Sequence, residues 1–171
     1  MNNITKHIIR FLLLVILQVT IFNQLELGFG IHIMILPLFV MLLPFEIGII
    51  SILSFAFLIG FITDIFSNTY GLHASSLVML AYFRPIVFKK FAPADGYDPL
   101  KEATFFDMGN SWFFYVFGSL LLIHHFWYFL IEIFRINEFF LILQNTIFSC
   151  IVSFLMAIVL QILMIKRGQR K

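Results

Sequence analysis

Ionisable side chains inside otherwise apolar runs are the first candidates for chemistry in this chain. Asp64 ends one apolar run, and a turn separates it from a second run that closes on Arg84 and Pro85. An ionisable group at membrane depth is costly, so it indicates either a functional site or a specific packing interaction. For Asp64 these interpretations are a proton-linked or partner-binding site, or a helix-end acid that accepts hydrogen bonds from residues 67–69 across the turn.

Two adjacent histidines, His124 and His125, lie near the centre of another apolar run. Neighbouring residues point about 100° apart on a helix, so the two rings cannot line one site. His124, Tyr128 and Glu132 share a face and could form a polar relay. A metal site needs three or four ligands and this face offers two. The favoured interpretation is that the histidines are hydrogen-bonded packing residues.

The residue patterns of the common enzyme classes are missing from the sequence. A membrane aspartyl peptidase needs two facing carboxylates, and only Glu132 could be the mate of Asp64. No serine has a histidine and an acid at the spacing of a catalytic triad, and there is no glycine-rich phosphate loop. Cys150 is the only cysteine, which excludes an intrachain disulfide and a cysteine-based metal site. We therefore expect no catalytic, metal or cofactor site.

Composition predicts the elements that must position these residues. The chain is 61% hydrophobic and 12% charged, with a mean hydropathy of +1.02, far above that of a soluble domain. We predict an all-α integral membrane protein, with residues 1–171 forming a single domain of six transmembrane helices in one bundle. The spans expected from the apolar runs are about 8–25, 31–45, 47–65, 72–88, 112–134 and 139–165, with 89–111 as a cytoplasmic loop.

The second span, 31–45, is short, so the count of six needs a separate argument. Joined to the third, it would make a helix of roughly 50 Å, too long for a hydrocarbon core of about 30 Å. Pro37 and Pro44 also favour a break.

The distribution of cations supports six spans with both termini in the cytoplasm. In that topology ten of the eleven Lys and Arg lie inside and only Arg135 lies outside, as the positive-inside rule expects. If residues 31–45 formed a re-entrant loop, everything after it would invert. The inside cations are Lys6, Arg10, Arg84, Lys89, Lys90, Lys101, Lys166, Arg167, Arg170 and Lys171. Arg84, Lys89 and Lys90 could also bind anionic lipid head groups, although the positive-inside rule alone accounts for them.

Small residues at helical spacing predict which faces pack. Ala56, Gly60 and Asp64 recur every four residues, and Gly71 and Ser75 repeat this spacing in the next run. With Arg84 and Pro85, these residues are our candidates for packing or partner interaction. The last run carries a similar stripe, which we expect to pack within the chain: Asn145, Ser149, Ser153, Ala157 and Gln161.

The stretch around Asp64 also carries a resemblance to a known family. Residues 60–64, GFITD, resemble the G-L-x-x-D signature that ends a middle helix in the rod shape-determining protein MreD family. The following turn (67–74), the segment AYFRP (81–85) and the loop segment 92–97 resemble the same family. Two departures are Ala56, where a glycine is common, and Thr69-Tyr70, which replaces a proline often found before the position of Gly71.

The resemblance implies a non-enzymatic subunit of the cell-elongation machinery in the bacterial inner membrane. Members of this family bind the single-span protein MreC. Through MreC they connect MreB filaments inside the cell to the SEDS glycosyltransferase and the transpeptidase that build peptidoglycan outside. The implied partners are thus MreC-like protein and membrane lipid, with no cofactor and no nucleic acid.

The alternative is the small-molecule-binding S component of an energy-coupling transporter, which also has six short helices. Such components commonly dock through small-xxx-small alanines in their first helix. Here residues 11–22 contain neither alanine nor glycine, which counts against this alternative.

Overall fold

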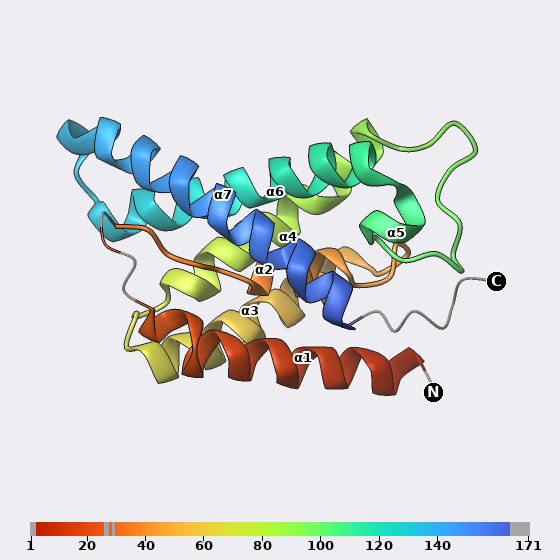
Figure 1. Cartoon of the computed structure of the whole chain (residues 1–171), viewed down its shortest axis with the longest axis horizontal. Helices are drawn as coiled ribbons and strands as arrows, with labels where there is room; N and C mark the ends of the chain where they lie inside the picture. Colours follow the sequence, from red (N-terminus) through yellow and green to blue (C-terminus); the bar gives the residue numbers. More distant parts are fainter. Residues whose placement is uncertain (1–2, 26–27, 29, 165–171) are drawn as a thin grey trace.

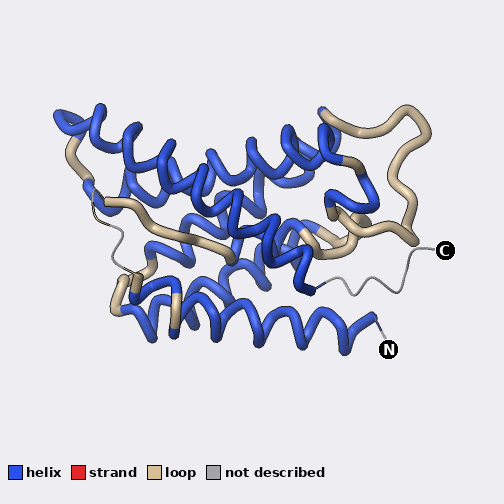
Figure 2. Tube along the Cα trace, in the orientation of Figure 1, coloured by secondary structure: helices blue, strands red, loops and turns tan. Residues whose placement is uncertain are grey.

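Helices form all the regular structure of this protein within the residues that the computed structural model describes, 3–25, 28 and 30–164 (Figures 1 and 2). Two single 3-10 turns, Phe22–Gln24 and Ile136–Glu138, lie between helices. The α-helices are α1 (Asn3–Thr20), α2 (Leu36–Met41), α3 (Ile49–Ser67), α4 (Leu72–Lys90), α5 (Phe105–Met108), α6 (Asn110–Ile133) and α7 (Phe139–Met164).

Four of these helical segments are long and apolar enough to cross a membrane: Thr5–Gln24, Ile49–Ser67, Asn110–Ile133 and Phe139–Met164. They agree with the prediction of an all-helical, multi-pass membrane protein. Helix α4 is as long as α3 but is more polar, because it carries Arg84, Lys89 and Lys90.

The segment predicted as a second transmembrane helix, 31–45, is not one continuous helix. Residues 31–35 are non-helical, and they lead into the six-residue helix α2. Pro37 explains where the helix begins, because its missing N–H and its fixed φ are tolerated only in the first turn, where the structure places it. Pro44 follows in the turn that ends the segment.

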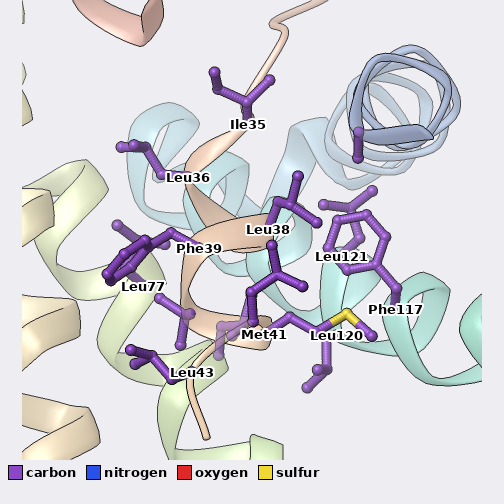
Figure 3. Close-up of a cluster of buried hydrophobic side chains, with 14 of the residues drawn as sticks. Ile35, Leu36, Leu38, Phe39, Met41, Leu43, Leu77, Phe117, Leu120 and Leu121 are labelled. Atoms are coloured by element: carbon purple, nitrogen blue, oxygen red, sulfur yellow. The ribbon is translucent and has the colours of Figure 1, made fainter. Parts of the chain in front are cut away.

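This broken segment occupies the centre of the molecule. Every residue from 33 to 43 is buried, and α2 contacts α1, α3, α4 and α6 (Figure 1). Around it α3 packs on α4, α4 on α6, and α6 on α7. Figure 3 shows Phe39 of α2 beside Leu77 of α4, and Leu38 and Met41 of α2 on the side of Phe117 and Leu120 of α6.

The turns gather at two ends of the molecule (Figure 1). The beginning of α1, the turn at 42–48 and the loop at 91–104 lie at one end, and the turns at 68–71 and 134–138 lie at the other. Lys6 and Arg10 of α1 form ion pairs with Glu102 of the loop, at 2.6 and 2.7 Å, whereas Arg135 lies at the opposite end. The predicted inside cations Lys166, Arg167, Arg170 and Lys171 lie outside the described residues.

Candidate functional site

Asp64, the acid that the sequence singled out, joins the end of α3 to the beginning of α4. It is 5% exposed, and its Oδ1 accepts hydrogen bonds from the Thr69 hydroxyl and from the backbone N–H of His73 at 3.0 Å. Its Oδ2 accepts the N–H of Ala74 at 2.9 Å. Asp64 therefore makes the contacts of the helix-end interpretation and extends them to the backbone of the next helix.

These contacts complete the N-terminus of α4. The N-cap residue, Gly71, has no side chain with which to satisfy the first N–H groups, which lack partners in any helix. The N–H of Leu72 donates to the Thr69 carbonyl at 3.1 Å, and Asp64 accepts the next two. A side chain from the preceding helix thus replaces the missing cap.

Gly60 allows α3 and α4 to approach closely just before this cap. A Cβ added to Gly60 would overlap the backbone N and Cα of Ala74 and the carbonyl oxygen of His73. Ala56, one turn earlier on α3, is fully buried. At Gly60 and Asp64 the predicted small face of α3 is therefore filled by α4 of the same chain.

Gly71 and Ser75, the predicted small face of α4, are not the residues that pack against Gly60 of α3. Gly71 has φ +95°, and a Cβ there would meet nothing within 4 Å, so the turn needs glycine for its backbone conformation. Ser75 is half-buried and donates to the Leu72 carbonyl at 3.1 Å. The residue of α4 that meets Gly60 is Ala74, between these two positions.

The non-helical segment 31–35 is held on one side by Gln18 of α1. The fully buried Gln18 amide donates from Nε2 to the Ile33 carbonyl and accepts the Ile35 N–H at Oε1, both at 2.8 Å. Non-helical backbone at membrane depth is tolerated only where protein groups satisfy it. Gln18 was not predicted as a functional residue, although an amide inside the first apolar run, several residues before its polar end, was a signal.

The polar stripe of α7 holds the other side of the same segment. Ser149 Oγ accepts the His32 N–H at 3.0 Å, and Ser153 Oγ accepts the Met34 N–H at 2.9 Å. His125 fixes the Ser153 hydroxyl, because its Nδ1 donates to the Leu121 carbonyl at 2.9 Å and leaves Nε2 to accept from Ser153 at 3.1 Å. This part of the stripe therefore packs within the chain.

The second buried histidine, His124, connects α6 to α4. His124 Nε2 lies 3.1 Å from the Ser76 hydroxyl of α4, while His125 faces α7. The adjacent rings therefore lie in separate contacts, as their helical spacing predicts. The described hydrogen bonds of His124 lead to Ser76 and not to Tyr128, so the relay along α6 is not formed from this histidine.

Arg84 completes the other end of the broken segment. Its side chain is buried, and Nη2 donates to the carbonyls of Met41 and Pro44 at 3.2 Å and to that of Leu43. These carbonyls lie at and just after the C-terminal end of α2, where a cation is favoured by the helix dipole. Pro85, the neighbouring candidate residue, is exposed. The sequence indicated the charge of Arg84 but not this capping role.

Comparisons with known proteins do not assign this chain to a family. A scan against protein-family models found no match, and neither did searches of curated proteins and of solved structures. Within the described part of the chain, no group of three or more His, Cys, Asp or Glu side chains could hold a metal ion.

Proposed function

We propose that this chain is an MreD-like, non-enzymatic subunit of a bacterial cell-elongation complex. It would cross the cytoplasmic membrane six times, with both termini inside, and would bind an MreC-like single-span protein. The observation that carries the proposal is that the stretch resembling the MreD family forms one fixed unit. Its glycine and acid, Gly60 and Asp64, lock the α3–α4 turn in a single conformation.

The topology in this proposal is supported by the path of the chain. Residues 31–43 run through the molecule between its two ends, and α1, α3, α4, α6 and α7 do the same (Figure 1). The described cations other than Arg135 lie at or toward one of these ends, which would face the cytoplasm by the positive-inside rule.

The outer face of α3 is the surface that we assign to the partner. Ala56, Gly60 and Asp64 are buried within the chain, Gly60 and Asp64 against α4, so they act by fixing this unit and not by direct contact with the partner. A neighbouring face of α3, about 100° round the helix from these residues, presents a stripe of large apolar residues at steps of four. We call it the α3 outer stripe: Phe57, Phe61 and Ile65, each about half exposed.

The turn next to this stripe adds a second exposed group. Tyr70 is 99% exposed and has φ +46°, a conformation that a tyrosine adopts only where the surrounding structure imposes it. An aromatic side chain that is apolar at one face and polar at its tip suits a membrane–water boundary, where a single-span partner leaves the bilayer. The stripe and Tyr70 together would present one continuous surface to a partner helix.

Co-purification of the tagged chain from native membranes in mild detergent tests this function. We expect an MreC-like protein to be recovered with the wild type, and the yield to fall at least several-fold with Phe61→Ala. Phe148→Ala is the matched control, because Phe148 of α7 is 49% exposed and Phe61 is 48% exposed. Equal yields from the two variants would exclude the α3 outer stripe as the surface that binds the partner. Recovery of paired ATPases with a large membrane coupling protein would instead identify a transporter S component.

A further inference from the structure

A groove of about 320 Å³ lies where the beginning of α3 meets the end of α4 and the following loop. Its apolar wall comes from the α3 side, with Ile47, Ile49 and Ile52, and its charged side comes from α4, with Arg84 and Lys89. Both cations are lining residues, whereas none of the described acidic residues lines the groove. Glu46, between two lining residues in the chain, is not one of them.

Arg84 has hydrogen-bonding capacity that the protein does not use. All three hydrogen bonds described for its side chain come from Nη2, and the buried Nε has no partner within the described residues. The guanidinium lies 4.3 Å from the centre of the Phe88 ring, and none of the described ion pairs includes it. A buried cation without a counter-ion is costly, so an anion in the groove would stabilise it.

We propose that this groove binds one anionic phospholipid. The lipid phosphate accepts hydrogen bonds from Arg84 and pairs with the exposed Lys89, and one acyl chain lies on the wall formed by Ile49 and its neighbours. Arginine suits phosphate because of its fixed set of N–H donors, and a lysine stem can cover apolar surface while its ammonium reaches the head group. The proposal does not depend on the function proposed above.

The shape of the groove favours a lipid over a free phosphate ion. Phe45, Ile47 and Ile49 line it next to the cations with apolar surface that is still partly exposed, and a hydrocarbon chain would bury this surface. The position of the groove also agrees with a bound phospholipid. Ile49 and Pro85 are exposed on the helices, while Ala92 and Tyr97 belong to the polar loop. The groove therefore spans the boundary at which phospholipid head groups lie.

Adjacent lysines at the end of α4 provide a matched test. Lys89 lines the groove, whereas Lys90, which is also exposed, does not, and the Lys90 ammonium lies 5.7 Å from the centre of the Phe91 ring. Delipidated protein in neutral detergent is titrated with dioleoyl phosphatidylglycerol and, separately, with dioleoyl phosphatidylcholine, and bound lipid is counted by native mass spectrometry. We expect one tightly bound phosphatidylglycerol, and binding about fivefold weaker in Lys89→Gln but unchanged in Lys90→Gln.

Two further variants and one competitor complete the test. Ala92→Trp fills the groove without removing a charge and is expected to displace the lipid. Arg84→Lys keeps the charge but loses the fixed donor set, and is expected to weaken binding, with its melting temperature recorded because Arg84 also caps α2. Equal losses in the two lysine variants, equal binding of both lipids, or complete displacement by glycerol 3-phosphate, which has no acyl chain, would each overturn the proposal.

Discussion

Asp64 on α3 accepts the backbone N–H of Ala74 on α4 at 2.9 Å, so the acid that ends one helix caps the next. A cap supplied from outside the helix has two effects. It stabilises the N-terminus of α4, and it fixes the angle at which the two helices leave their turn. Partner recognition by the outer face of this unit would depend on that angle.

Substitution of Asp64 separates its charge from its hydrogen bonding. Asp64→Ala leaves the N–H groups of His73 and Ala74 without their acceptor, and we expect the free energy of unfolding to fall by about 3 kcal/mol. Asp64→Asn keeps one acceptor oxygen and is expected to lose less. Thermal unfolding in detergent measures both, with the exposed loop variant Asp95→Asn as the control. If Asp64→Asn matches the wild type in stability and partner recovery, Asp64 has no charge-dependent role.

Gly60 and Gly118 form a matched pair of helical glycines. A Cβ at Gly60 would overlap the backbone of Ala74, which cannot move as a side chain can, whereas a Cβ at Gly118 of α6 would meet nothing within 4 Å. We expect Gly60→Ala to lower the free energy of unfolding by about 1–3 kcal/mol. Gly118→Ala should leave it unchanged or slightly raised, because alanine favours the helix. Melting temperatures of the two variants in the same detergent give the comparison, and a similar decrease in both would contradict the close approach of α3 and α4.

The sequence alone predicted the features that depend on local pattern. Hydropathy predicted the membrane class and placed the long helices, and steps of four placed Gly60 and Asp64 on one face and Ser149 and Ser153 on another. These patterns indicated which faces pack because small and polar residues on a lipid-facing surface would gain nothing.

The sequence did not predict features that arise from contacts between distant segments. Residues 31–35 have the same apolar character in a helix as in an extended chain, so hydropathy could not show that the helix begins only at Leu36. The roles of Gln18 and Arg84 follow from that break, because each bonds backbone groups that a continuous helix would have satisfied internally. Until this break is known, the sequence does not show which backbone groups Gln18 and Arg84 could bond.

Gln18 tests whether the non-helical segment depends on its side-chain partners. Gln18→Leu preserves the approximate volume but leaves the Ile33 carbonyl and the Ile35 N–H unpaired, at a cost of about 1–3 kcal/mol for each. We expect a lower melting temperature and faster hydrogen exchange at the Ile35 amide. Thr20→Val is the control, since the hydrogen bond described for the Thr20 hydroxyl goes to the Ile16 carbonyl of its own helix. Unchanged exchange at Ile35 in the Gln18 variant would contradict the role of Gln18 in holding the non-helical segment.

Glu102 makes the stability of the loop end dependent on pH. Burial alone would raise the pKa of Glu102, but the hydrogen bonds from Arg10 and Lys6 outweigh it, and the pKa lies below its usual value of 4.5. A carboxylate whose pKa is lower in the folded state stabilises that state above the unfolded pKa, and the contribution is lost as pH falls below 4.5 through the folded value.

Thermal unfolding from pH 7 to pH 3 should therefore show a decrease in the melting temperature that Glu102→Gln diminishes. The same variant should be less stable than the wild type at pH 7, because the neutral amide loses the ion pairs to α1. Glu138→Gln removes an exposed ion pair with Arg135 at the opposite end, and is expected to keep the wild-type pH profile. Identical profiles for wild type and Glu102→Gln would show that the contact between the loop and α1 does not contribute to stability.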